Sequence, residues 1–232
     1  MPSQLVFDFE HRPALEAQDF FVNPCNQEAV AWIDNWPEWP SPAFVVHGPS
    51  GCGKSHLAQV FLAHASGVRI SPSQLLDEEP QVLLGGAEAC LLDDLDVAFT
   101  CCNNHALEEA LLHLYNILKE HKLTMMITAK SPPSRWGITL PDLSSRLKTA
   151  TLAKIGPPDD NLLAAVLVKQ FSDRQLTIES EVVAFVQARI ERSFKALGQF
   201  VAIADKLSLA KKSRVSITLM RMAIEKLDET RQ

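Results

Sequence analysis

The chain has 232 residues, of which 47% are hydrophobic and 22% charged, a composition typical of globular proteins. Its net charge of −6 is opposite in sign to that expected of a protein that coats DNA. Its apolar runs are much shorter than the roughly 20 residues that span a bilayer. The five cysteines show no C-x-x-C spacing, and no basic-then-apolar leader opens the chain. We therefore expect a cytoplasmic protein without disulfides or a thiolate zinc site.

Short apolar runs alternate with helical stretches through the first two thirds of the chain. The runs predict strands over residues 43–47, 67–70, 89–93, 123–128 and 149–155. Helices are predicted over 54–65 and 106–121, the second because four leucines recur on one face at helical spacing. Buried strands that alternate with helices indicate a mostly parallel sheet of the α/β class.

The pattern changes at Gly156-Pro157-Pro158, and from residue 159 onward it predicts only helices, over 159–172, 180–191, 194–209 and 216–228. The net charge changes there as well, from −8 over residues 1–155 to +2 over residues 156–232. The proline pair ends the preceding element, and Asp159 and Asp160 suit the first turn of a helix. We therefore expect an N-terminal arm over 1–18, an α/β domain over 19–155 and a helical domain over 156–232.

The most specific motif is Gly48-Pro-Ser-Gly-Cys-Gly-Lys-Ser55, which matches the pattern G-x-x-x-x-G-K-[ST] between a predicted strand and a predicted helix. Glycines allow the backbone N–H groups to surround a phosphate, and the following helix directs its positive end at the same anion. Lys54 would reach the outer phosphates, and the Ser55 hydroxyl would ligate Mg²⁺. The nucleotide contacts predicted from this phosphate loop are Gly48, Pro49, Ser50, Gly51, Cys52, Gly53, Lys54, Ser55 and His56. The alternative, a glycine turn beside a surface lysine, is disfavoured by the flanking strand and helix.

Two carboxylates, Asp93 and Asp94, end the apolar run Ala-Cys-Leu-Leu at residues 89–92. The carboxyl ends of strands form the edge at which open α/β sheets bind their ligands. In a phosphate-loop protein, Asp93 would hold the magnesium shell and Asp94 would orient or polarise water. Without such a loop, the same pair would more commonly begin a turn. We expect Asp96 to face solvent.

Together with the phosphate loop and the Asp93–Asp94 pair, the segments 127–133 and 140–147 resemble the AAA+ ATPases of the DnaA group. The segment Asp-Phe-Phe-Val-Asn-Pro-Cys-Asn at residues 19–26 is similar to the adenine-side segment of that group, which assigns Phe21 and Val22 to the nucleotide. The resemblance covers nearly the whole chain. It implies a five-stranded parallel sheet followed by a helical lid, and binding of ADP or ATP with Mg²⁺.

Within that group, the chain looks like a regulator that inactivates the initiator rather than like the initiator itself. Only residues 229–232 follow the last predicted helix, where the initiator carries a helix-turn-helix domain. Gln-Leu-Val-Phe-Asp-Phe at residues 4–9 resembles a peptide that docks on the β sliding clamp, with a polar contact from Gln4 and apolar anchors from Leu5, Phe7 and Phe9. The alternative for this segment is a first strand, because its apolar residues alternate.

Three further residues decide the activity that the resemblance implies. Arg146 matches the arginine finger of the group, which stabilises charge on the γ-phosphoryl of a neighbour's nucleotide; without this context it would be read as a surface ion pair. Lys130 stands where DnaA has an aspartate, and Thr128 is the nearest polar substitute. Lys195 stands where an arginine touches the phosphates, and a lysine lacks the forked geometry. We therefore expect nucleotide binding with weak intrinsic hydrolysis.

The leading interpretation is a negative regulator of DNA replication initiation whose partners are DnaA and the sliding clamp. We expect it to reach DNA only through the clamp and to have no membrane partner. The sequence leaves open whether it forms a homo-oligomer. One alternative is a loader or motor ATPase that acts on DNA with its own ATP turnover; the acidic α/β domain, Lys130 and Lys195 weaken it. Another is a phosphate-loop kinase for a small molecule, which the helical C-terminal part and the lack of a second substrate motif weaken.

Overall fold

The computed structural model describes residues 21–101, 104–211 and 214–229. The arm, with Gln4, Leu5, Phe7 and Phe9, lies outside these residues. The described chain divides into two compact units. The first holds residues 21–49 and 53–156, and the second holds Ser50–Cys52 together with the residues from Pro157 onward. Among the described helices, none has the length and apolar character needed to cross a membrane.

The first unit is built on a parallel sheet of five strands in the order β2-β3-β4-β1-β5. The strands are β1 (Ala43–His47), β2 (Val68–Arg69), β3 (Ala89–Leu92), β4 (Thr124–Ala129) and β5 (Thr151–Lys154). The three strands in the middle of the sheet are buried along almost their whole length, as expected where helices cover both faces. The predicted fold class, an α/β phosphate-loop domain with a five-stranded parallel sheet, is confirmed.

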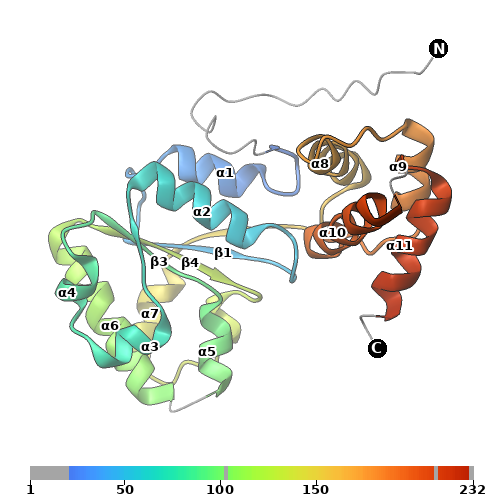
Figure 1. The fold of residues 1–232 in the computed structure, drawn as a ribbon. Coiled ribbons are helices and arrows are strands. Elements are labelled where there is room, and N and C mark those ends of the chain that lie inside the picture. The colour runs from blue at the N-terminus through green and yellow to red at the C-terminus, as the bar shows by residue number, and fades with distance from the viewer. Residues whose placement is uncertain (1–20, 102–103, 212–213, 230–232) are drawn as a thin grey trace. The chain divides into compact units, whose positions relative to one another are not determined.

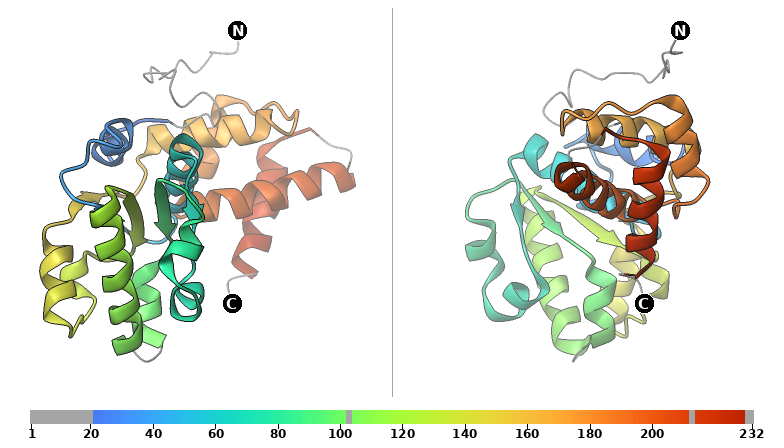
Figure 2. Two further views of the ribbon diagram at one scale, coloured as in Figure 1. Left: turned by 90° about the vertical axis from the view of Figure 1, so that its left-hand side faces the viewer. Right: turned by 45° about the vertical axis from the view of Figure 1, so that its right-hand side comes forward.

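Helices cover both faces of this sheet (Figures 1 and 2). On one face lie α1 (Gln27–Asp34) and α2 (Lys54–Ala65), and the remaining helices of the unit lie on the other. Those are α3 (Pro72–Asp77), α4 (Pro80–Leu84), α5 (Leu95–Cys101), α6 (Asn104–His121) and α7 (Pro141–Lys148), with a short 3-10 helix η2 (Pro133–Arg135). The leucines predicted to share one face of α6 are buried in the core on this second face.

Aromatic packing holds α2 against its face of the sheet. The ring of Trp39 stacks on that of Phe61 in α2, with 5.4 Å between centroids, and lies 5.0 Å from that of Phe44 in β1. Phe44 and Phe61 are fully buried. Because β1 and α2 flank the phosphate loop, this packing fixes both ends of the loop.

Over its described residues, the second unit has four helices with a core of their own, namely α8 (Asp160–Ser172), α9 (Ser180–Gln187), α10 (Phe194–Lys211) and α11 (Ile217–Glu229). Phe171 of α8 and Phe200 of α10 are fully buried in that core. Asp159 caps α8, since its side chain accepts a hydrogen bond of 2.8 Å from the backbone N–H of Leu162. The cap satisfies one of the free N–H groups at the helix start.

Candidate functional site

The phosphate loop joins the end of β1 to the start of α2. Gly51 and Gly53 have φ values of 75° and 104°, in the left-handed region that favours glycine. The N–H of Gly48 donates to the carbonyl of Ala129 at the end of β4, at 3.1 Å. The loop therefore begins at the carboxyl edge of the sheet and turns directly into a helix N-terminus, the arrangement that suits an anion.

The Lys54 side chain is held inside this loop. The residue is only 6% exposed, and its Nζ donates to the carbonyls of Gly48 and Pro49 at 2.9 and 3.1 Å. An ammonium group has three donors, so a third remains for a phosphate oxygen. Ser55 and His56 follow on the exposed side of the first turn of α2, and Cys52 is buried.

The second acidic element lies at the ends of the neighbouring strands β3 and β4. Asp93 accepts a hydrogen bond of 2.5 Å from the hydroxyl of Thr128, which is fully buried in β4. The same hydroxyl oxygen accepts the backbone N–H of Asp94 at 2.8 Å. Asp94 has a φ of 49° and its residue is exposed. Thr128 thus contacts both residues of the acidic pair through one hydroxyl group.

An arginine that sequence reasoning missed is paired with Asp93. Arg69, the last residue of β2, places its NH1 atom 2.8 Å from Oδ2 of Asp93. Oδ1 is the atom bonded to Thr128, so both carboxylate oxygens have partners. Arg69 lies near the end of the strand predicted over 67–70, and Asp93 ends the strand predicted over 89–93, but the sequence does not show that these two strands are neighbours in the sheet.

These contacts bear on the expected Mg²⁺ site. The oxygen donors assigned to it, the Ser55 hydroxyl and the Asp93 carboxylate, have the hard character that Mg²⁺ prefers. The Asp93 charge is already balanced by a guanidinium, however, and both of its oxygens are engaged. The donor set therefore does not fit the metal as expected.

The loop after β4 is fixed by Asp96, which we expected to face solvent. Instead, its Oδ2 accepts the backbone N–H groups of Lys130 at 2.9 Å and Ser131 at 3.2 Å. Its Oδ1 is buried. The expectation was wrong because the position of Asp96, at the start of α5, brings it against a loop that is 34 residues away in sequence.

Cations gather around His47, the last residue of β1. Burial, followed by the charges of Lys154, Arg135 and Lys54, lowers the pKa of His47 from its usual 6.5, against a smaller opposing effect of the Glu28 carboxylate. Lys154 ends β5 and lies opposite His47 in the register of the two strands. Lys154 and Lys54 therefore place positive charge at this part of the sheet edge, which suits a polyphosphate.

The predicted adenine-side segment forms a turn before α1. The side-chain amide of Asn26 donates to the carbonyl of Phe21 at 3.0 Å, and its carbonyl oxygen accepts the N–H of Asn23 at 2.8 Å. The carbonyl of Cys25 accepts the N–H of Gly156, just beyond β5, at 2.9 Å. Phe21 and its neighbour Val22 are half-buried at the start of this turn. Their assignment to the nucleotide stays a prediction.

Arg146 lies in the last turn of α7. Its guanidinium makes two hydrogen bonds to Asp142, at 3.2 and 3.1 Å, and its Cζ lies 5.4 Å from the centroid of the Tyr115 ring in α6. The side chain is 25% exposed. The planar group is thus held by an acidic side chain and an aromatic ring, and keeps access to solvent.

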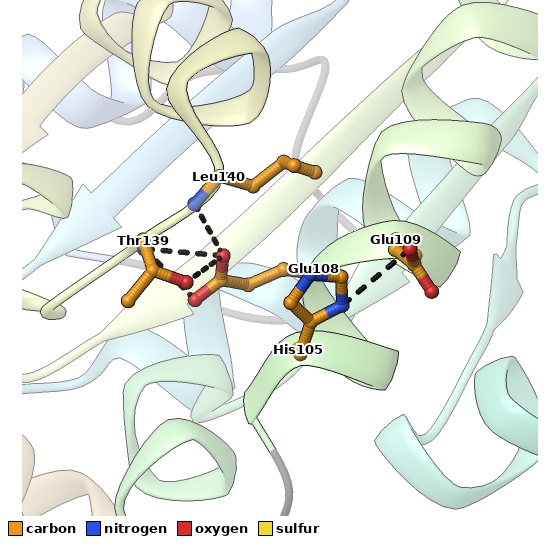
Figure 3. Close-up of polar contacts among 5 residues, drawn as sticks. All are labelled: His105, Glu108, Glu109, Thr139 and Leu140. Carbon is orange, nitrogen blue, oxygen red and sulfur yellow. Dashed lines mark hydrogen bonds and ion pairs between the residues drawn. The ribbon is translucent and has the colours of Figure 1, made fainter.

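A buried carboxylate that sequence reasoning missed fixes the start of α7. Glu108 of α6 is fully buried and accepts hydrogen bonds from Thr139, from its N–H at 3.0 and 3.1 Å and from its hydroxyl at 2.9 Å. It also accepts the N–H of Leu140, the residue before α7, at 2.6 Å (Figure 3). The helix that carries Arg146 is therefore anchored to α6 at its first turn.

Lys195, the expected lid residue, is an exposed side chain in the first turn of α10. The preceding residue, Phe194, donates its N–H to the carbonyl of Gly51 at 2.8 Å, within the second unit. A Cβ at Gly51 would lie 2.9 Å from Cβ of Ser193, so that close approach requires glycine there. The role of Lys195 toward phosphate stays a prediction.

No protein-family model matches the chain. In sequence it is 27% identical, over 81% of its own length and 83% of the relative's, to an uncharacterized protein of Haemophilus influenzae. It is also 25% identical to the chromosomal replication initiator protein DnaA of Thermoanaerobacter pseudethanolicus, over 93% of its length and 53% of the relative's. The chain thus spans about half the length of this DnaA.

Solved structures show the same fold. Domain III of Thermotoga maritima DnaA superposes with a TM-score of 0.76 at 17% identity, over 90% of this chain and 94% of that one. AMPPCP-bound DnaA from Aquifex aeolicus gives 0.71 at 17% identity, over 94% and 71%. The chain therefore has the AAA+ fold of DnaA domain III, and its distant sequence relatives include DnaA.

Proposed function

We propose that this protein is a regulator of replication initiation that acts on DnaA, as the DnaA-related protein Hda does. It binds ADP or ATP at the phosphate loop and docks on the DNA-loaded sliding clamp through residues 4–9. It then offers Arg146 to ATP held by DnaA, and the resulting hydrolysis inactivates the initiator. Its contact with DNA is indirect, through the clamp.

The observation that carries the proposal is the orientation and partial exposure of the Arg146 side chain in a fold like that of DnaA domain III. An arginine finger must present a planar cation to a neighbouring molecule, where it stabilises the charge on the transferring γ-phosphoryl. Arg146 is oriented by Asp142 and Tyr115 and is partly exposed, and Glu108 anchors the helix that carries it. These contacts orient the guanidinium before a partner arrives, which lowers the entropic cost of docking.

Nucleotide binding is supported by the buried Lys54, the left-handed glycines and the cations around His47. Strong intrinsic hydrolysis is not supported. A threonine hydroxyl has one proton, and that of Thr128 is donated to Asp93. It is therefore not free to donate to a phosphate oxygen or to position an attacking water. The chemistry that we propose takes place on ATP bound to DnaA.

The test is single-turnover hydrolysis of labelled ATP preloaded on DnaA. We expect the full chain to accelerate this hydrolysis when the DNA-loaded clamp is present and to have little effect without it. A loader or motor would instead hydrolyse its own ATP in the absence of DnaA, and a kinase would transfer phosphate to a small molecule. Either of those results, without acceleration on DnaA, would overturn the proposal.

A further inference from the structure

We infer that Arg69 is a built-in counter-ion of Asp93, and that nucleotide therefore binds at the phosphate loop with an affinity that does not depend on Mg²⁺. The inference rests on the nucleotide binding in the proposed function and adds the ionic state of that same site. It concerns an arginine that neither the phosphate-loop motif nor the acidic pair requires.

The backbone places the two charged groups together. Strands β2 and β3 run in parallel with Arg69 paired to Leu91, two residues before Asp93. Both side chains therefore project from adjacent strand ends, although they are 24 residues apart in sequence. Because the sheet fixes the backbone at Arg69 and next to Asp93, this ion pair does not require two flexible surface side chains to find each other.

The Asp93 carboxylate is also fixed from its other side. Thr128 is fully buried, and its hydroxyl holds Oδ1, while NH1 of Arg69 holds Oδ2 at 2.8 Å. The side chain of Asp93 is 19% exposed and that of Arg69 is 45% exposed. The carboxylate is thus the less accessible partner, and its negative charge is met by a cation on the protein.

This arrangement changes what a metal ion could contribute. In phosphate-loop proteins, Mg²⁺ is held by the phosphates, one hydroxyl and one acidic side chain, and it screens that acid from the phosphates. Here Arg69 already screens Asp93, and Lys54 lies inside the loop. Adding Mg²⁺ should therefore change nucleotide affinity little. Without Arg69, the free carboxylate would repel the phosphates unless a metal came between them.

The experiment measures ADP affinity of the full chain by calorimetry in excess Mg²⁺ and again in EDTA. We expect the wild-type protein to give the same dissociation constant within about threefold in the two buffers. Arg69→Ala should bind at least about tenfold more weakly in EDTA and recover when Mg²⁺ is added. Arg69→Lys keeps the positive charge, so its dissociation constant for ADP should remain largely independent of Mg²⁺.

The matched control is Arg174→Ala. Arg174 is a similarly exposed arginine in the second unit, paired with Asp205 at 3.8 Å, and its loss should leave both dissociation constants unchanged. Melting temperatures of all variants verify that they are folded. A wild-type protein that needs Mg²⁺, with the same dependence in Arg69→Ala, overturns the inference but leaves the proposed function intact. A folded wild-type protein that binds ADP in neither buffer overturns both.

Discussion

Thr128 links the acidic pair to β4 through one hydroxyl, which donates to Asp93 and accepts from the N–H of Asp94. The residue was singled out from the sequence only as the nearest polar neighbour of Lys130. Its contacts with the acidic pair could not be predicted, because they depend on β3 and β4 being adjacent in the sheet. Both hydrogen bonds of this hydroxyl group go to the acidic pair.

The lowered pKa of His47 predicts how the free energy of unfolding depends on pH. Its pKa in the folded state lies below the 6.5 of the unfolded chain, so between those two values only the unfolded state binds the proton. The free energy of unfolding should therefore fall as the pH drops below 6.5 and continue to fall until the folded pKa is passed. Replacing His47 by Gln should remove this contribution.

The measurement is urea unfolding at about pH 7.5 and about pH 5.5. The loss of stability between these values should be smaller in His47→Gln than in the wild-type protein. His121→Gln, at an exposed position at the end of α6, serves as the control and should show the wild-type loss. Equal losses in all three proteins would mean that His47 titrates alike in the folded and unfolded chains.

At the scale of elements, the position of α7 depends on one buried acid. Replacing Glu108 by Ala leaves the N–H groups of Thr139 and Leu140 without their acceptor, which should reduce the free energy of unfolding by about 1–3 kcal/mol. The control is its neighbour Glu109, an exposed residue paired with His105 at 3.4 Å (Figure 3), whose replacement by Ala should cost less than about 0.5 kcal/mol.

Denaturant unfolding of both variants checks this prediction. Similar costs for the two substitutions would show that Glu108 does not anchor α7. A second readout follows from the fold: because α7 carries Arg146, Glu108→Ala should also weaken stimulation of ATP hydrolysis on DnaA, under conditions in which the variant remains folded.

How far the sequence predicts the elements depends on length and local signals. The bounds of β1 and α2 were predicted correctly, because an apolar run and the phosphate-loop motif mark them on both sides. The five helices α1, α3, α4, α5 and α7 were missed. Each has five to eight residues, too few for a clear helical period, and helices this short owe their stability to tertiary packing.

Other errors were ones of boundary. The last strand was predicted over 149–155 but begins at Thr151, because the N–H groups of Thr149 and Ala150 bond back to the end of α7. In the candidate site, the sequence singled out the phosphate loop and the acidic pair, and their roles toward nucleotide and Mg²⁺ stay predictions. Arg69 and Glu108 were not singled out, since each acts through a partner that only the folded sheet or helix pair brings near.

At the scale of the whole molecule, the proposed function requires the arm to act as a separate docking peptide. Replacing both Gln4 and Leu5 by Ala should abolish binding to the sliding clamp and leave the melting temperature unchanged. Clamp binding should be lost because Leu5 is one of the apolar anchors, and burial of a large apolar side chain contributes about 1.5–3 kcal/mol before ordering costs. Binding is measured by surface plasmon resonance on immobilised clamp.

A matched double substitution tests whether any change in the arm would have the same effect. His11→Ala with Arg12→Ala alters the arm beyond the docking peptide and should bind the clamp normally. If the Gln4 and Leu5 variant melts at a lower temperature while binding normally, the segment is a strand of the folded domain, as its alternating apolar residues would also allow.

The proposed function depends on this protein contributing an arginine to chemistry on a neighbour's nucleotide. It is tested most directly by single-turnover hydrolysis of ATP preloaded on DnaA, with clamp and DNA present, comparing wild type, Arg146→Ala and Lys148→Ala. Lys148 is an exposed cation in the same turn of α7, so its variant controls for loss of charge. We predict that Lys148→Ala stimulates normally, while Arg146→Ala keeps its ADP affinity and loses stimulation by about 10³-fold or more. Undiminished stimulation by Arg146→Ala would show that Arg146 is not an arginine finger.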